Sequence, residues 1–71
     1  MTVTTAHLGA ARLIVWDRQA RRNAWDLTTM TAIADAIEAA GADSSVRCVL
    51  LRGAGEHFSA GDDLQAAIEA L

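Results

Sequence analysis

Proline and lysine are absent from this chain, and cysteine occurs once, at Cys48. A chain with no proline and only five glycines does not have the composition of a disordered segment, and one cysteine cannot form an internal disulfide. The absence of lysine excludes a phosphate-binding P-loop, which requires that side chain. Cys48 lies within an apolar run, so we expect it to be a small buried residue.

No segment approaches the roughly 20 apolar residues of a membrane-spanning helix. The N-terminal residues also lack the basic region and apolar core of a secretory signal. We therefore expect a cytoplasmic protein with no membrane partner.

The chain is short for its apolar content, since it has 71 residues of which 52% are hydrophobic. A domain of this size buries only about 60% of the surface that its unfolded chain exposes. Some apolar surface is therefore expected to pack against something outside these residues. The formal net charge of −3 argues against nucleic-acid binding, although Arg18, Arg21 and Arg22 form a basic cluster near Trp16 and Trp25.

The first part of the chain is predicted to form a β-hairpin. Residues 3–7 and 12–17 are the two strands, and Gly9 supplies the conformational freedom that the turn needs. The second strand has an apolar centre bounded by charges, which suggests that both of its faces are covered. Residues 18–24 show no periodicity and are predicted to be a loop.

A helix and a third strand follow, giving the α/β class with the order ββαβ. Asp26 is predicted to cap the helix and Gly41 to end it in the left-handed conformation. The apolar stripe of this helix consists of Leu27, Met30, Ile33, Ala34, Ile37 and Ala40. A buried strand at residues 47–52 would then complete a right-handed βαβ unit.

A glycine-rich loop connects the third strand to a last helix, which is predicted to begin near Asp63. This helix has no stop signal before Leu71, and we take this as the mark of a cut chain. Amides at a helix start have no intrahelical partner and lie at the positive end of its dipole. Because Ser59, Ala60 and Gly61 leave room for a ligand, the loop is suited to form half of an oxyanion hole.

Two other chemical interpretations of this loop are weaker. His57, Ser59 and Asp62 are the residue types of a hydrolase triad, but one short loop rarely brings such groups together in space. His57, Asp62 and Asp63 are metal-ligating types, yet a solvated histidine and a helix cap explain them better. We therefore expect no metal.

Two segments closely resemble motifs of the crotonase superfamily, the enoyl-CoA hydratases and isomerases. Residues 15–25, VWDRQARRNAW, are similar to the family phrase in which a strand ends in N-R-P-x-x-R-N-A-L. Residues 53–64, GAGEHFSAGDDL, are similar to the family phrase G-x-G-x-x-F-S-A-G-x-D-L. Together they span nearly the whole chain in the right order. The resemblance implies that residues 1–71 are the N-terminal part of a single domain with the crotonase-type spiral fold, ending in a truncated helix.

The resemblance also implies roles for individual residues. Arg21 or Arg22 would approach the CoA phosphates, and Ala24 would line the pantetheine path. Ala60 would contact the adenine end through its backbone, and the N–H of Asp62 would be the first oxyanion donor. The residues that would contact substrate or CoA are Arg21, Arg22, Ala24, Ala60, Gly61, Asp62, Asp63 and Leu64.

The chain departs from the family pattern at three places. Gln19 or its neighbourhood carries no proline where the family often has one. Trp25 replaces a usual leucine, and Asp62 stands where alanine is common. A carboxylate directed at an enolate would oppose its charge, so we expect the Asp62 side chain to point away. The second oxyanion amide and the proton-moving carboxylates of the family come later in the chain than these residues, and Glu38, Glu56 and Glu69 match none of those positions.

The function that the resemblance implies is an acyl-CoA thioester-processing enzyme of the enoyl-CoA hydratase or isomerase type. It would need no cofactor, since the CoA thioester is its substrate. Its expected partners are the missing remainder of the domain or a second chain, and further copies in a trimer or hexamer. Alternatives are a non-catalytic crotonase-like fragment or interaction module and, more distantly, a nucleic-acid binder that uses the arginine-tryptophan cluster.

Overall fold

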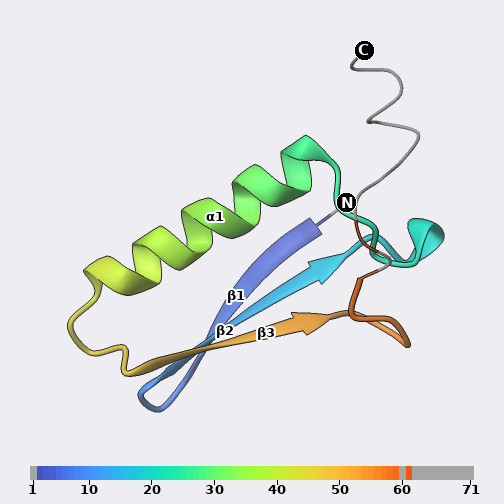
Figure 1. The fold of residues 1–71 in the computed structure, drawn as a ribbon. Helices are drawn as coiled ribbons and strands as arrows, with labels where there is room; N and C mark the ends of the chain where they lie inside the picture. Colours follow the sequence, from blue (N-terminus) through green and yellow to red (C-terminus); the bar gives the residue numbers. More distant parts are fainter. Residues whose placement is uncertain (1, 60, 62–71) are drawn as a thin grey trace.

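The computed structural model describes residues 2–59 and residue 61. Within this part of the chain, three strands form one sheet in the order β1-β2-β3, and the helix α1 lies across one of its faces (Figure 1). The predicted order ββαβ is therefore confirmed. The helix predicted to begin near Asp63 lies outside the described residues.

The first two strands form the predicted hairpin. β1 (Thr2–Leu8) pairs with β2 (Ala11–Asp17) in antiparallel orientation, with Leu8 opposite Ala11 beside the turn. Gly9 has a φ of 60°, a left-handed conformation that glycine adopts without steric cost. A two-residue turn thus sets the register of the whole pair.

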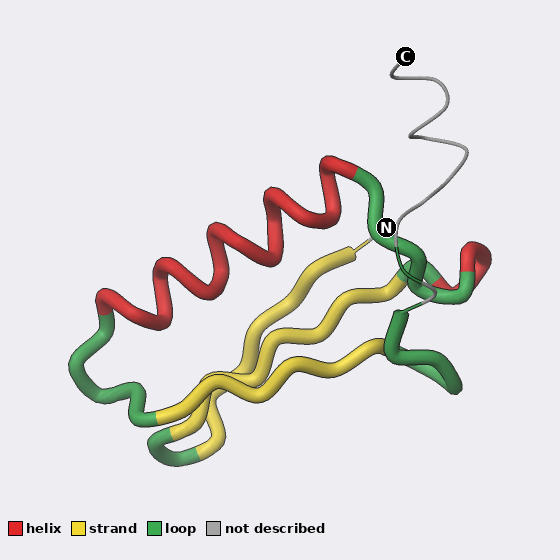
Figure 2. The backbone as a smooth tube through the Cα atoms, in the orientation of Figure 1, coloured by secondary structure: helices red, strands yellow, loops and turns green. Residues whose placement is uncertain are grey.

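The chain passes from β2 through α1 (Leu27–Ala42) to β3 (Cys48–Gly53), which lies parallel to β2. The register runs from Ala11 opposite Cys48 to Trp16 opposite Gly53. Because the strands are parallel, their carboxyl ends lie at one edge of the sheet. Figure 2 shows the loops that follow β2 and β3 gathered at this edge.

Both ends of α1 are set by aspartates. The Oδ1 atom of Asp26 accepts hydrogen bonds from the Thr29 N–H at 2.8 Å and the Thr29 hydroxyl at 2.6 Å, which confirms the predicted cap. The predicted end at Gly41 is wrong, because the helix continues to Ala42 and Gly41 does not have a positive φ. Asp43 ends the helix instead: its Oδ1 atom accepts from the Ser45 N–H and hydroxyl, and this local turn replaces a further helical turn.

The face of α1 that packs on the sheet is rotated from the predicted stripe. Of that stripe, Ile33 and Ala40 are buried. The exposed members are Leu27, Met30, Ala34 and Ile37. The packed face is completed by Thr29, which is fully buried, and by the half-buried Ala32 and Ala36. Apart from Ile33, the packed face thus carries small side chains, and the larger apolar side chains of Leu27, Met30 and Ile37 are exposed.

The core lies between β2 and α1. Ile14 and Trp16 have no exposed surface, whereas Leu13 and Val15, on the opposite face of β2, are half-exposed. The expectation that both faces of β2 are covered is therefore wrong for the described part of the chain. Arg12 shares the buried face and reaches Asp43 beyond α1, with 2.9 Å between Nη2 and Oδ2, so this is the face that α1 covers.

The third strand is exposed rather than buried. Every residue from Cys48 to Arg52 is exposed, and only Gly53 is buried. β3 is an edge strand, and within the described residues no element lies beyond it. The expected burial of Cys48 is wrong for this reason.

Candidate functional site

Two loops meet at the carboxyl edge of the sheet. The loop after β2, residues 18–26, contains the short 3₁₀ turn η1 (Gln19–Arg21), which the sequence did not predict. The loop after β3 comprises residues 54–59 and 61 within the described chain. We call them the β2 loop and the β3 loop.

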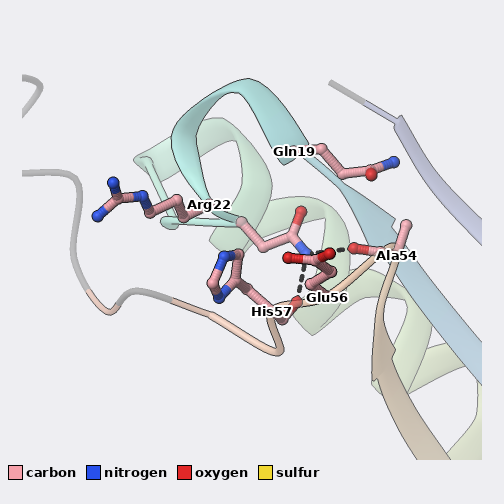
Figure 3. Close-up of a pocket in the computed structure, with 6 residues that line it drawn as sticks. Gln19, Arg22, Ala54, Glu56 and His57 are labelled. Atoms are coloured by element: carbon pink, nitrogen blue, oxygen red, sulfur yellow. Dashed lines mark hydrogen bonds between the residues drawn. The ribbon is translucent and has the colours of Figure 1, made fainter.

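Asn23 joins the two loops and has no exposed surface. Its Nδ2 atom donates hydrogen bonds to the carbonyl oxygens of Ala54, at 2.7 Å, and of His57 (dashed lines in Figure 3). Its Oδ1 atom accepts from the Arg18 N–H at 2.8 Å. The φ of Asn23 is 58°, a left-handed conformation in which asparagine is several-fold enriched among non-glycine residues.

Trp16 holds the next carbonyl of the β3 loop from within the core. Its Nε1 atom donates to the Phe58 carbonyl at 2.7 Å, and its own carbonyl accepts from the Ala54 N–H at 2.8 Å. The Trp16 ring makes edge-to-face contacts with Trp25 and Phe58, with centroid distances of 5.1 and 4.8 Å. The carbonyls of Ala54, His57 and Phe58 are thus all bound by two buried side chains.

Two glycines allow the β3 loop to fold back on the end of its strand. A Cβ atom on Gly53 would overlap the carbonyl oxygens of His57 and Phe58 and would lie 2.8 Å from the Phe58 Cα. A Cβ atom on Gly55, where φ is 74°, would overlap the side chain of Gln19. The turn of the β3 loop over its own strand therefore depends on the missing side chain at Gly53, whereas at Gly55 the positive φ is the main reason for glycine.

Gly61 is tied to the residue that precedes the helix cap. The Trp25 N–H donates to the Gly61 carbonyl at 2.9 Å, and the Gly61 N–H donates to the Ser59 Oγ at 3.0 Å. A Cβ atom on Gly61 would meet nothing within 4 Å, but the φ of 93° is one that other residues rarely adopt. The described part of the β3 loop is therefore fixed at its beginning and at its end.

Three of the predicted CoA-contacting residues lie in the β2 loop. Arg21 and Arg22 are exposed, and Figure 3 shows the Arg22 side chain extended away from Gln19 and Glu56. Ala24 is buried. Gly61 lies in the β3 loop, as described above. The other predicted contacts, at Ala60, Asp62, Asp63 and Leu64, lie outside the described residues.

Arg18, which the sequence presented only as part of a basic cluster, organises the β2 loop. Its guanidinium donates to the Ala24 carbonyl, and its Nη2 atom lies 3.5 Å from the Asp26 Oδ2. Hydrogen bonds from Thr29, supplemented by the positive charge of Arg18, lower the pKa of Asp26. The helix cap is therefore a carboxylate near neutral pH, and it connects the β2 loop to α1.

The two loops surround an open hollow of about 370 Å³. Its lining is mostly polar and is made by Gln19, Arg22, Asn23, Ala54, Glu56 and His57. Figure 3 shows these side chains contributed from both loops. The buried Asn23 amide forms the inner wall of the hollow, and the charged groups stand at its exposed rim.

The described residues bear only in part on the alternative sites. Trp16 is fully buried, so its ring offers no free face on which a nucleic-acid base could stack. The Ser59 hydroxyl accepts a hydrogen bond from within its own loop. Among the described residues, no three His, Cys, Asp or Glu side chains lie together as a metal site would require. Asp62 and Asp63, which the metal hypothesis also included, lie outside the described residues. Within the same part of the chain, no helix is long and apolar enough to cross a bilayer.

Sequence analysis missed the organising roles of Asn23 and Trp16. Asn23 is part of the first family motif. The residues around it in sequence do not indicate which carbonyl groups its side chain binds. Those carbonyls lie 31 and 34 positions further along the chain. The position of Trp16 at the end of an apolar strand was the available signal for a buried ring with a hydrogen-bonding N–H.

Solved structures with the same arrangement define the class of protein. The enoyl-CoA hydratase/isomerase of Xanthobacter autotrophicus Py2 is 40% identical with a TM-score of 0.89, over 96% of this chain and 25% of that chain. Carnitinyl-CoA hydratase from Mycobacterium avium is 38% identical with a TM-score of 0.90, over 96% of this chain and 26% of that chain. The fold is the N-terminal part of a crotonase fold.

Sequence comparison gives the family. The enoyl-CoA hydratase/isomerase family profile matches residues 9–70. The chain is 44% identical over 59 residues to EchA13 of Mycobacterium tuberculosis, a match that covers 83% of this chain and 19% of EchA13. This chain belongs to the enoyl-CoA hydratase/isomerase family. It spans about a fifth to a quarter of the length of these relatives.

Proposed function

We propose that this chain supplies CoA contacts and the first oxyanion-hole donor of an acyl-CoA thioester-processing enzyme of the enoyl-CoA hydratase or isomerase type. The observation that supports it most is the fixed junction of the β2 and β3 loops at the carboxyl edge of the sheet, in a chain that belongs to this family. Residues 1–71 act as the N-terminal part of a single domain. The rest of that domain, or a second chain, supplies the second donor and the carboxylates that move protons.

The chemical step explains why a fixed loop matters. When a thioester is converted to its enolate, negative charge develops on the carbonyl oxygen, and backbone N–H groups stabilise it best when they are already in place. Trp16, Asn23 and the Trp25 N–H hold the carbonyl groups of the β3 loop. The loop therefore leads to Asp62 from a backbone that needs little rearrangement when substrate binds.

The proposed roles follow from the family motifs that the residues match. The N–H of Asp62 binds the thioester oxygen, with Gly61, Asp63 and Leu64 beside it. Ala24 lines the pantetheine path, and Ala60 meets the adenine end through its backbone. Arg21 or Arg22 pairs with the CoA phosphates, because both carry an exposed positive charge at the same edge of the sheet.

The same proposal includes the assembly. The acyl-CoA thioester is the substrate, and no further cofactor takes part. The enzyme is a trimer or hexamer of complete domains. Its apolar contact surfaces include those that the described residues leave exposed, among them Leu50 on β3 and Leu27 on α1.

The test compares the side chain of Asp62 with its backbone N–H. It uses a completed protein, in which residues 1–71 replace the matching segment of the Xanthobacter autotrophicus relative. Asp62→Ala is expected to keep most crotonyl-CoA turnover, because the donor N–H remains. An ester linkage in place of the Asp62 N–H should lower kcat about 10²- to 10³-fold while CoA binding, measured by calorimetry, persists. Loss of turnover in Asp62→Ala with full activity in the ester variant would refute the donor assignment.

A further inference from the structure

Three of the carbonyls in the β3 loop are held by side chains that come from far away in the sequence, and one residue, Asn23, holds two of them. We propose that Asn23 is a positioning residue of the acyl-CoA site, whose side-chain amide sets the backbone that leads to the oxyanion donor. This inference rests on the proposed function for its catalytic consequence. Its structural part rests only on described residues.

The Asn23 amide uses each of its polar atoms. Both N–H groups of Nδ2 are taken, one by the Ala54 carbonyl and one by the His57 carbonyl, and Oδ1 accepts the Arg18 N–H. The residue is fully buried, so water does not compete for these bonds. Few other side chains combine two donors and one acceptor at this length, and asparagine also suits the φ of 58°.

The position of these bonds connects Asn23 to the donor. Ala54 and His57 lie at the two ends of the turn that brings the β3 loop back over Gly53. Beyond this turn, the Trp25 N–H binds the Gly61 carbonyl, and that carbonyl belongs to the same planar peptide group as the next N–H along the chain. Asn23 and Trp25 are separated by one residue. A shift at Asn23 is therefore transmitted to both attachments of the loop.

Asn23→Asp isolates the donor function. It keeps the size of the side chain and the oxygen that accepts from Arg18, but in its ionised form it presents oxygen instead of N–H to the carbonyls of both Ala54 and His57. Asn23→Gly is the reference without a titrating group, because glycine keeps the backbone conformation and removes the amide. Glu38→Gln is the control: it exchanges a carboxylate and an amide at an exposed position on α1, outside both loops.

The experiment measures turnover of crotonyl-CoA by the completed protein per folded molecule, with folded sites counted by CoA titration. We expect Asn23→Asp and Asn23→Gly to lower kcat about 10- to 100-fold with little change in KM, because a displaced donor weakens the transition state more than the bound substrate. Acidification from pH 8 to pH 6 should shrink the deficit of Asn23→Asp alone. Burial raises the pKa of the introduced carboxyl, and its protonated form regains an O–H donor.

Hydrogen exchange of peptides covering the β3 loop gives a readout that does not depend on activity. Exchange should be faster in both Asn23 variants than in Glu38→Gln, which should match the parent. An Asn23→Asp protein that melts earlier but turns over normally per folded molecule would overturn the proposal, as would an unchanged exchange rate. If the parent protein shows no turnover, the proposed function is refuted instead. Faster exchange of the β3 loop in the Asn23 variants would then still show that Asn23 holds this loop in place.

Discussion

The candidate site depends on a small number of buried polar contacts. Asn23 and Trp16 have no exposed surface, and their side-chain N–H groups bind three carbonyls of a loop that begins more than thirty positions later. A buried N–H donor that loses its partner costs about 1–3 kcal/mol, more than a formed hydrogen bond gains on average. These contacts therefore act mainly by excluding other conformations of the loop.

The glycine at the end of β3 gives a residue-scale prediction. Gly53→Ala should lower the free energy of unfolding of the completed protein by about 1–3 kcal/mol, because the new Cβ would overlap backbone atoms of His57 and Phe58 that have little freedom to move. Urea denaturation followed by tryptophan fluorescence measures the change. Trp16 lies beside this loop and reports on its packing.

The control for this prediction is a glycine in open space. Gly41 lies within α1, and a Cβ there would meet nothing within 4 Å. Gly41→Ala should raise the free energy of unfolding by up to about 1 kcal/mol, because alanine favours the helix. Equal effects of the two substitutions would contradict the packing that we describe around Gly53.

At the scale of elements, α1 is connected to the rest of the fold by charged groups at both ends. Asp26 at its start pairs with Arg18 of the β2 loop, and Asp43 beyond its end pairs with Arg12 of β2. Hydrogen bonds from Ser45, with a smaller contribution from the charge of Arg12, lower the pKa of Asp43. Both ends of the helix therefore carry carboxylates whose ionised form is favoured in the folded state.

The helix cap gives a pH-dependent prediction. The folded-state pKa of Asp26 lies below its unfolded value of about 3.9, so its stabilisation is complete above that pH and is lost as the pH falls through the folded-state pKa. Asp26→Ala should lower the free energy of unfolding by about 1 kcal/mol at pH 7. The difference from the parent should begin to shrink below about pH 4, where Asp26 takes up a proton in the unfolded parent, and it should vanish once the folded parent is protonated as well.

Asp35→Ala is the matched control for this prediction, because it removes an exposed acid from the middle of the same helix. Denaturation curves at intervals from pH 7 to pH 3 supply the comparison. A difference between parent and Asp26→Ala that stayed constant through acid would show that the carboxylate does not act as the cap.

At the scale of the whole molecule, the described chain leaves much apolar surface uncovered. Val49, Leu50 and Leu51 are all exposed on an edge strand, and Leu27 and Ile37 are exposed on α1. An edge strand with apolar side chains on both faces pairs readily with other chains. Such surface is typical of a segment that packs against further parts of a domain.

This surface predicts how residues 1–71 behave when purified alone. We expect an associated or poorly folded polypeptide with no turnover of crotonyl-CoA, because exposed apolar side chains and an open strand edge favour association. Light scattering during gel filtration, with circular dichroism melts at several concentrations, measures this. A well-dispersed monomer with a cooperative melt would contradict it.

Local patterns were enough to predict the order of the elements and the family. The strand patterns, Gly9 at the turn and the Asp26 cap each act within a few residues of sequence, and the structure confirms them. The two motifs were recognisable because they are runs of adjacent residues. A structural feature that depends only on residues adjacent in the sequence can be predicted from the sequence alone.

Burial and the geometry of the site depended on contacts between distant residues. Cys48 looked like a core residue because its neighbours are apolar, but burial requires another element to lie against it, and within the described chain β3 is an edge. The helix packs on the sheet through a face that includes Thr29 and Ala36, and apolar periodicity alone does not identify that face. Asn23 acquires its function only when parallel pairing of β2 and β3 brings two loop carbonyls to its amide.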